Sequence, residues 1–135
     1  MPDSAAVTLL RPVRVLVAGA DSEVVGHLRD ELLRMGFHTM STTRESRIAD
    51  LAALERVNVV ILEISSGLAA AASTAATLEA LPQRVRVLLA GPRGRAAARL
   101  GYDMVDVPSS AEELAAAVHD AYRGGPLPAE QSSRT

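Results

Sequence analysis

The sequence predicts a doubly wound α/β domain, with a five-stranded parallel sheet and helices on both faces. Short apolar runs alternate along the chain with longer segments in which apolar residues recur every three or four positions. This alternation is typical of parallel strands joined by helical crossovers. The clearest strand is 57–64, because the four consecutive apolar residues from Val59 to Leu62 indicate burial on both faces of a sheet.

Two strands and two helices are expected in the first half of the chain. Val13 to Ala18 is the first strand, and Ser22 is placed to cap the helix that follows it. That helix has one apolar face and ends at Gly36, a residue that favours the C-cap position. The remaining elements of this half are a strand at 37–41 and a helix that begins at Thr42 or Thr43.

The second half continues the same alternation after the strand at 57–64. An alanine-rich helix is expected at 68–81, where Pro82 stops it. A capping box predicts the last helix, since Ser109 or Ser110 precedes Glu112 or Glu113 by three residues. The other expected elements are strands at 85–90 and 104–107 and a short helix at 95–100.

Composition sets the domain size and excludes several classes of function. A chain of 135 residues can form one domain with a hydrophobic core, expected at 13–123 between a flexible segment at 1–12 and a disordered tail at 124–135. The net charge of -2 and the three aromatic residues give no support for a nucleic-acid partner. No apolar run is long enough for membrane insertion, so a cytoplasmic location is expected.

Cofactor and metal chemistry has no clear signature in this sequence. Cysteine is absent, which excludes disulfides and thiol nucleophiles, and the three histidines lie on different predicted elements without the spacing of metal ligands. We therefore expect no cofactor, no metal site and no catalytic residues.

The order and length of the predicted elements resemble the receiver domain of bacterial response regulators, over about residues 13–123. Four segments carry the resemblance: the strand, acidic turn and helix around Asp21, the step Met35-Gly36-Phe37, the strand that ends in Glu63, and the segment from Gly101 to Pro108. The resemblance implies the flavodoxin-like, receiver-like sheet topology.

Most positions that carry the family's chemistry are altered in this chain. In receivers, two acidic residues help to hold Mg²⁺, an aspartate accepts a phosphoryl group, and a hydroxyl and a lysine contact that group. The acceptor position falls on Glu63 and the acidic pair on Ala20 and Asp21. The hydroxyl, aromatic switch and lysine positions fall on Ala90, Met104 and Val107. Because phosphoryl transfer needs a metal and cations to neutralise charge, ordinary aspartyl phosphorylation is not expected.

Three interpretations of Glu63 remain open at this stage. It is a solvated carboxylate without a role, a constitutive mimic of the phosphorylated state, or the partner of an arginine in an ion pair that replaces the metal. Arg93 and Arg95 follow the fourth strand at the same sheet edge, so they are candidates for that ion pair or for an anion site. Asp21 is expected to interact with the N–H groups at the start of a helix, with a vestigial metal ligand as the alternative.

The sequence therefore predicts a pseudo-receiver: a phosphorylation-independent protein-interaction module in bacterial signalling or cell organisation. Its partner is another protein or a second copy of the chain. One alternative is a small-anion or nucleotide site at the carboxyl edge of the strands, and another is a receiver phosphorylated at a non-standard residue. The resemblance implies an interaction face built from the last helix, the last strand and the helix before it, which carries Arg95, Arg99, Asp103, Asp106, Glu112, Asp120 and Arg123.

Overall fold

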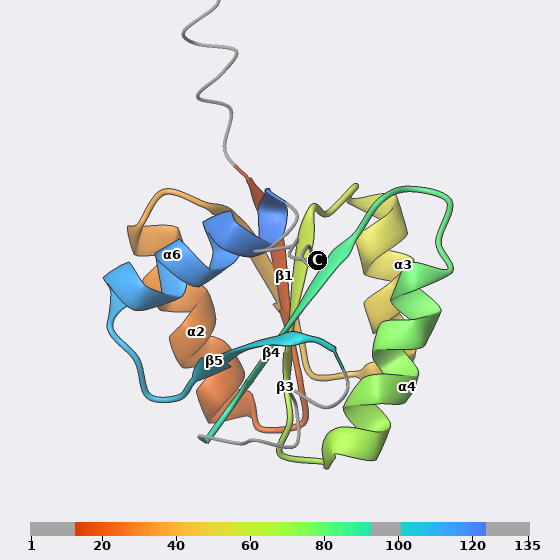
Figure 1. Cartoon of the computed structure of the whole chain (residues 1–135), viewed down its shortest axis with the longest axis horizontal. Helices are drawn as coiled ribbons and strands as arrows, with labels where there is room; N and C mark the ends of the chain where they lie inside the picture. The colour runs from red at the N-terminus through yellow and green to blue at the C-terminus, as the bar shows by residue number, and fades with distance from the viewer. Residues whose placement is uncertain (1–12, 93–100, 124–135) are drawn as a thin grey trace, which may run out of the picture.

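A five-stranded parallel sheet forms the centre of the molecule, as the sequence predicts (Figure 1). The computed structural model describes residues 13–92 and 101–123. The strand order is β2-β1-β3-β4-β5, the flavodoxin-like order, with β3 between β1 and β4 and with β2 and β5 at the two edges. The strands are β1 (Arg14–Ala18), β2 (His38–Thr42), β3 (Val59–Glu63), β4 (Arg86–Gly91) and β5 (Asp103–Asp106).

Helices cover both faces of the sheet, so the described residues form three layers (Figure 1). On one face lie α2 (Ser22–Arg34) and α6 (Ala111–Tyr122), and on the other lie α3 (Glu45–Leu54) and α4 (Leu68–Glu79). The two faces have separate apolar cores, and β3 contributes alternate residues to each of them. All five residues of β3 are buried, which confirms the prediction made from its apolar run.

The beginnings of two helices differ from the sequence predictions. Asp21, and not Ser22, is the N-cap of α2, because its extended backbone lets the side-chain Oδ1 accept hydrogen bonds from the N–H groups of Glu23 (3.1 Å) and Val24 (3.3 Å). The α3 helix begins at Glu45 and not at Thr42 or Thr43. Thr42 ends β2, and its hydroxyl accepts a hydrogen bond from the N–H of Arg44 (3.1 Å) in the connecting turn.

Other predicted helix signals are confirmed. Ser110 and Glu113 form the capping box of α6, with reciprocal hydrogen bonds of 2.9 and 3.0 Å. Gly36 follows α2 with a φ of 94°, a conformation that favours glycine. The other elements begin and end within about two residues of their predicted bounds, as is usual for helix ends. The predicted helix at 95–100 and the predicted flexible segments at 1–12 and 124–135 lie outside the described residues.

Within those same residues, no helix combines the length and the apolar character that crossing a membrane requires.

Candidate functional site

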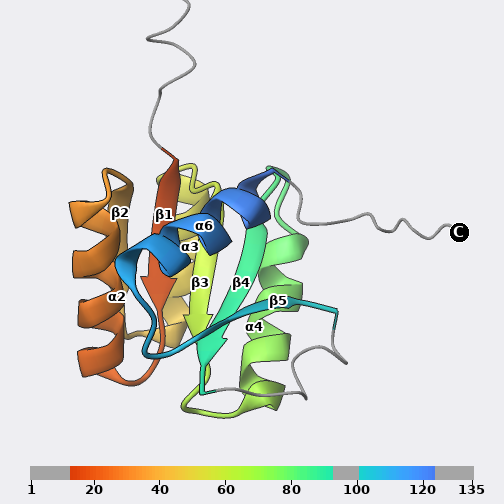
Figure 2. The same ribbon diagram turned by 60° about the vertical axis from the view of Figure 1, so that its left-hand side comes forward.

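The carboxyl ends of β1, β3 and β4 lie at one edge of the sheet, at the bottom of Figure 2. The register places Ala18 beside Leu62 and Glu63 beside Ala90. In open parallel sheets, this edge is where ligands usually bind. Glu63, the last residue of β3, therefore lies where the sequence predicts the degenerate site.

Glu63 is buried, with only 7% of its surface exposed, and no other charged residue of the described segments is buried. Its Oε1 accepts hydrogen bonds from the backbone N–H of Asp21 (3.1 Å) and from the hydroxyl of Ser65 (2.9 Å). Its Oε2 accepts one from the backbone N–H of Ser65 (2.6 Å). These donors offset the cost of removing a carboxylate from water. The interpretation of Glu63 as a solvated carboxylate is therefore wrong.

The Glu63 side chain folds over the end of β1, at a position where only glycine leaves room for it. A Cβ atom on Gly19 would lie 2.7 Å from the Cβ of Glu63 and 2.9 Å from its Cδ. Gly19 and Ser65 are thus part of the site. The sequence suggests Ser65 only as a member of the alternative anion site, and it does not indicate that either residue contacts Glu63. A hydroxyl two residues after the carboxylate was the available signal, since serine in such a turn often donates to a nearby acceptor.

Asp21 caps a helix and does not face a metal site. Its Oδ1 is bound to the first turn of α2, which confirms the preferred prediction for this residue. Ala20 offers no ligand atom, and both oxygens of Glu63 accept hydrogen bonds from N–H or O–H groups. Since Mg²⁺ requires several converging oxygen ligands, these residues do not fit the metal that receivers use. The described segments contain no group of three or more histidine or acidic side chains able to hold a metal ion.

The three other altered positions pack against the apolar cores. Ala90 is fully buried beside Glu63 and has no group that could donate to a phosphoryl oxygen. Val107 packs against the core under α2 and α6, and Met104 packs against the core on the opposite face. The positions that the resemblance assigns to a hydroxyl, a lysine and an aromatic residue thus make apolar contacts.

The predicted ion pair of Glu63 with Arg93 or Arg95 remains a prediction, because both arginines lie outside the described residues. The hydrogen bonds of Glu63 to Asp21 and Ser65 are present without them.

A small pocket of about 160 Å³ adjoins Glu63 between the beginnings of α3 and α4. Ala18, Ala71 and Ile48 contribute to its apolar wall, and Thr43 and Glu45 contribute polar atoms. None of these groups forms the nucleophile–base arrangement that covalent catalysis requires.

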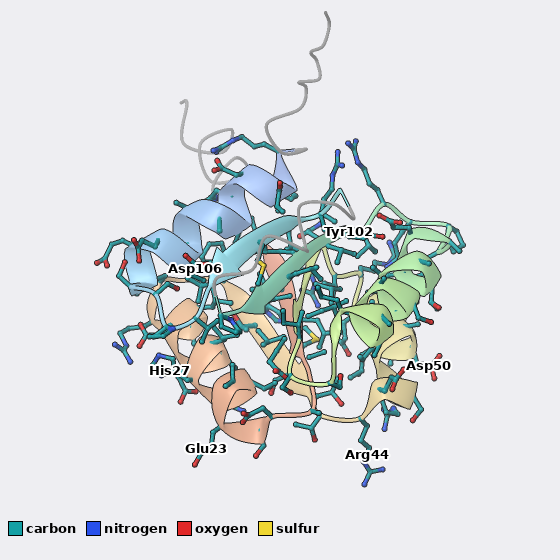
Figure 3. The ribbon with its side chains drawn as sticks, turned by 60° about the horizontal axis from the view of Figure 1, so that its bottom comes forward. Glu23, His27, Arg44, Asp50, Tyr102 and Asp106 are labelled. Carbon is teal, nitrogen blue, oxygen red and sulfur yellow. The ribbon has the colours of Figure 1, made fainter. Side chains whose placement is uncertain are left out.

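The described part of the predicted interaction face lies on β5 and α6 and is exposed. Figure 3 shows Asp106 at the end of β5, close to the beginning of α6. Arg123 pairs with Asp120 at 2.9 Å, whereas Arg95 and Arg99 lie outside the described residues. The described members of the face are therefore mainly acidic: Asp103, Asp106, Glu112, Asp120 and Arg123.

No model of a known protein family matches this sequence, and no curated protein matches it either. Solved structures, however, are similar to its fold. The receiver domain of a modulated diguanylate cyclase from Desulfovibrio desulfuricans aligns with a TM-score of 0.71 at 16% identity, over 84% of this chain and 96% of that one. A receiver domain protein from Clostridium thermocellum aligns with a TM-score of 0.70 at 14% identity, over 83% of this chain and 95% of that one.

A third example is a CheY-like receiver domain from Methylobacillus flagellatus, with a TM-score of 0.69 at 13% identity, over 82% of this chain and 99% of that one. The chain therefore has the fold of response regulator receiver domains. The resemblance found in the sequence is confirmed at the level of the fold.

Proposed function

We propose that this chain is a pseudo-receiver, a receiver-fold domain that binds a protein partner without being phosphorylated on a carboxylate. The observation that carries the proposal is the hydrogen bonding of Glu63, whose two oxygens are bound inside the protein where a receiver exposes its acceptor. A phosphoryl acceptor must present a free oxygen to the donor in line with its leaving group. Glu63 is only 7% exposed and three of its lone pairs already accept hydrogen bonds, so a phosphoryl donor has little access to either oxygen.

The surroundings of Glu63 add a second argument against phosphoryl transfer. Ala90 and Val107 supply neither a hydroxyl nor a cation, and Asp21 is bound to the first turn of α2. A phosphoryl group on Glu63 would place at least one further negative charge in a buried environment without a counter-charge from these residues, which is energetically unfavourable.

Glu63 instead links segments that are distant in the sequence. Its hydrogen bonds join the end of β3 to the beginning of α2 and to the loop before α4. In this proposal the carboxylate holds the carboxyl edge in one conformation, so partner binding does not depend on a phosphorylation signal. This role resembles that of a constitutive mimic of the phosphorylated state, because the conformation does not depend on a signal. It differs because it needs neither the hydroxyl nor the aromatic switch residue of receivers.

The proposed partner surface is the β5–α6 face. Because β5 is an edge strand, one side of it is not covered by another strand. A groove of about 500 Å³ beside it combines the apolar Met104, Val107 and Pro108 with the carboxylates of Asp106 and Glu113. An apolar centre with charged neighbours is typical of protein interfaces. The predicted face as a whole carries both signs, since Arg95, Arg99 and Arg123 accompany its carboxylates, so it suits a partner with a complementary pattern of charges.

A small-anion site at the strand edge, one of the alternatives from the sequence, has less support. The carboxylate of Glu63 lies at this edge and would repel an anion. The hydroxyl of Ser65 is already bound to that carboxylate.

Intact-mass measurement after incubation with acetyl phosphate and Mg²⁺ tests phosphorylation directly. The expected result is no phosphoryl adduct on the protein or on its Glu63→Gln variant. An adduct lost in Glu63→Gln would overturn phosphorylation independence, and one retained in that variant would point to a non-standard residue.

Charge reversal on the proposed face tests the interaction. For Asp106→Arg, affinity capture from the source cells should show loss of a specific partner protein. If the partner is a second copy of the chain, light scattering should show loss of the dimer. Asp50→Arg, an exposed substitution on α3, is the matched control and should leave binding unchanged. Equal behaviour of the two variants would count against the β5–α6 face.

A further inference from the structure

An open cleft of about 490 Å³ lies at the β2 edge of the sheet, between α2 and α3. Its position is far from the proposed partner face, since β2 and β5 are the two outermost strands (Figure 2). Its lining includes neither Glu63 nor the residues hydrogen-bonded to it. The cleft is therefore a separate feature of the molecule.

The charge of the cleft is opposite to that of the whole chain. Three arginines, Arg29, Arg44 and Arg47, are among its lining residues, and no aspartate or glutamate is. The protein as a whole has a net charge of -2. Four hydroxyl side chains complete the polar lining: Ser22, Ser41, Thr42 and Thr43.

The arginines of the cleft have donors free for a ligand. Arg44 and Arg47 form no ion pair with a carboxylate in the described part of the chain. Figure 3 shows Arg44 extending from the molecule toward solvent. Arg29 pairs with Asp30 through Nε (3.1 Å), while its Nη1 donates to the hydroxyl of Ser41 (3.2 Å) at the cleft.

The backbone at the cleft also favours an anion. The α3 helix begins there, and its N-cap residue, Arg44, makes no side-chain capping hydrogen bond. The helices α2 and α6 are capped by Asp21 and Ser110, whereas α4, like α3, has no side-chain cap. The N–H groups and the positive dipole end at a helix beginning favour negative charge.

Gly26 keeps the cleft open on its α2 side. A Cβ atom at this position would have Arg29 Nη2, at 3.7 Å, as its nearest neighbour, so packing does not require glycine there. Glycine inside a helix is less stable than alanine. Since packing does not require glycine at position 26, its presence is consistent with a need for open space in the cleft. The cleft volume lies within the range of roughly 300–1,000 Å³ that is typical of pockets for small organic molecules.

We propose that this cleft binds a small ligand with two or more phosphate groups, such as a nucleoside diphosphate. Arginine matches phosphate because its planar guanidinium can donate two parallel hydrogen bonds. Arg44 and Arg47 contact the phosphates, Arg29 and the hydroxyls complete the anion site, and Leu51 provides apolar surface for the rest of the ligand. This inference does not depend on the proposed function of the β5–α6 face.

Calorimetric titration at low ionic strength tests the proposal, with inorganic pyrophosphate, ADP and adenosine as probes. Pyrophosphate and ADP should bind with one saturable site, and adenosine should not bind measurably. The double variant Arg44→Gln/Arg47→Gln should weaken both anions by about tenfold or more, because it removes two charge-assisted contacts. Both side chains are exposed, and far-UV circular dichroism would check that the variant folds.

Arg34→Gln is the matched control, because Arg34 is an exposed arginine on α2 that pairs with Glu31 and does not line the cleft. It should leave both affinities unchanged. A second variant, Gly26→Leu, fills the cleft without changing its charge and should weaken ADP more than pyrophosphate.

Absence of saturable binding of pyrophosphate and ADP would overturn the proposal. It would also be overturned if Arg34→Gln lost as much affinity as Arg44→Gln/Arg47→Gln, because that result indicates non-specific electrostatic attraction. Binding of an acidic peptide or of single-stranded nucleic acid, without binding of either phosphate probe, would also contradict it.

Discussion

Three protein donors replace the water that the Glu63 side chain loses when it is buried. The donors come from two segments, the beginning of α2 and the loop after β3, so the carboxylate has a stabilising role of its own. If a substitution removes one of these acceptor oxygens, a buried donor is left without a partner. The free-energy penalty of that unsatisfied donor exceeds the net stability that one neutral hydrogen bond contributes.

Glu63→Gln should therefore lower the free energy of unfolding by about 1–3 kcal/mol, since the amide directs a donor toward an N–H group or a hydroxyl. Urea denaturation followed by circular dichroism measures the change. The control Glu112→Gln alters an exposed glutamate on α6 and should shift stability by less than about 0.5 kcal/mol. Equal stability of Glu63→Gln and the wild type would contradict the stabilising role.

Gly19 should be as sensitive as Glu63 to substitution. Gly19→Ala should destabilise the protein, because the new Cβ would collide with the Glu63 side chain. In the background of Glu63→Gly the same substitution should cost much less, since that change removes the Cβ of residue 63 together with the rest of the side chain. A double-mutant cycle in urea measures this coupling, and strictly additive effects would show that the two residues are independent.

At the scale of the elements, the connections at the carboxyl edge depend on particular helix ends. The α2 helix begins with the Asp21 side chain bound to its first turn, while the backbone N–H of the same residue donates to Glu63. One residue thus joins a helix beginning to the end of a neighbouring strand.

Asp21→Ala should lower stability by about 0.5–2 kcal/mol through loss of the N-cap. The backbone donor to Glu63 remains in this variant, so the loss should come mainly from α2. Ser22→Ala provides the comparison, since Ser22 is the first helical residue and makes no capping hydrogen bond. Thermal unfolding followed by circular dichroism distinguishes the two, and a larger effect at Ser22 would reverse the assignment of the cap.

A second connection joins the residue before β5 to the end of α4. The hydroxyl of Tyr102 donates to Oε1 of Glu79 (3.0 Å). Partial burial, followed by this hydrogen bond and by the negative charge of Glu79, raises the pKa of Tyr102 above its usual value of 10.0. The pKa of Tyr102 is thus higher in the folded protein than in the unfolded chain. The stability that protonated Tyr102 contributes to the fold is complete below the unfolded-state pKa, and it is lost as the pH rises through the folded-state pKa.

Absorbance titration of tyrosinate should therefore show Tyr102 ionising above pH 10.0. Glu79→Gln should move the midpoint downward, since it removes the negative charge beside the hydroxyl. Tyr102→Phe identifies the signal among the two tyrosines of the chain. An unchanged midpoint in Glu79→Gln would mean that the carboxylate does not contribute.

At the scale of the whole molecule, the two cores share one sheet. Alternate residues of β3 face α2 and α6 on one side and α3 and α4 on the other. Loss of packing on either face therefore disturbs the same central strand, and the two cores should unfold together.

Leu32→Ala and Leu78→Ala, in opposite cores, should each lower stability by about 2–5 kcal/mol while keeping a single transition. Native-state hydrogen exchange, read separately for the helices on each face, provides the measurement. Protection lost on one face alone would show that the two cores are independent.

The sequence predicts the alternation of strands and helices well, because periodicity and the capping box around Ser110 are local signals. It predicts the position of Glu63 but not its burial, because that burial depends on donors near Asp21, more than forty positions away along the chain. The sequence predicts Ser22 as the cap of α2, one residue after the observed cap. The extended backbone of Asp21, with ψ of 102°, decides which side chain reaches the helix. The cleft at β2 was not predicted, since it forms only when α2 and α3 lie at the same sheet edge.

The close fit of Glu63 over Gly19 makes position 63 sensitive to the length of its side chain. Aspartate at position 63 would be too short to reach the same donors, so it would leave a void above β1 and polar groups without partners. The hydroxyl, cation and second acidic group would still be missing at Ala90, Val107 and Ala20. We therefore expect Glu63→Asp to lower stability, so a stable fold favours glutamate at this position.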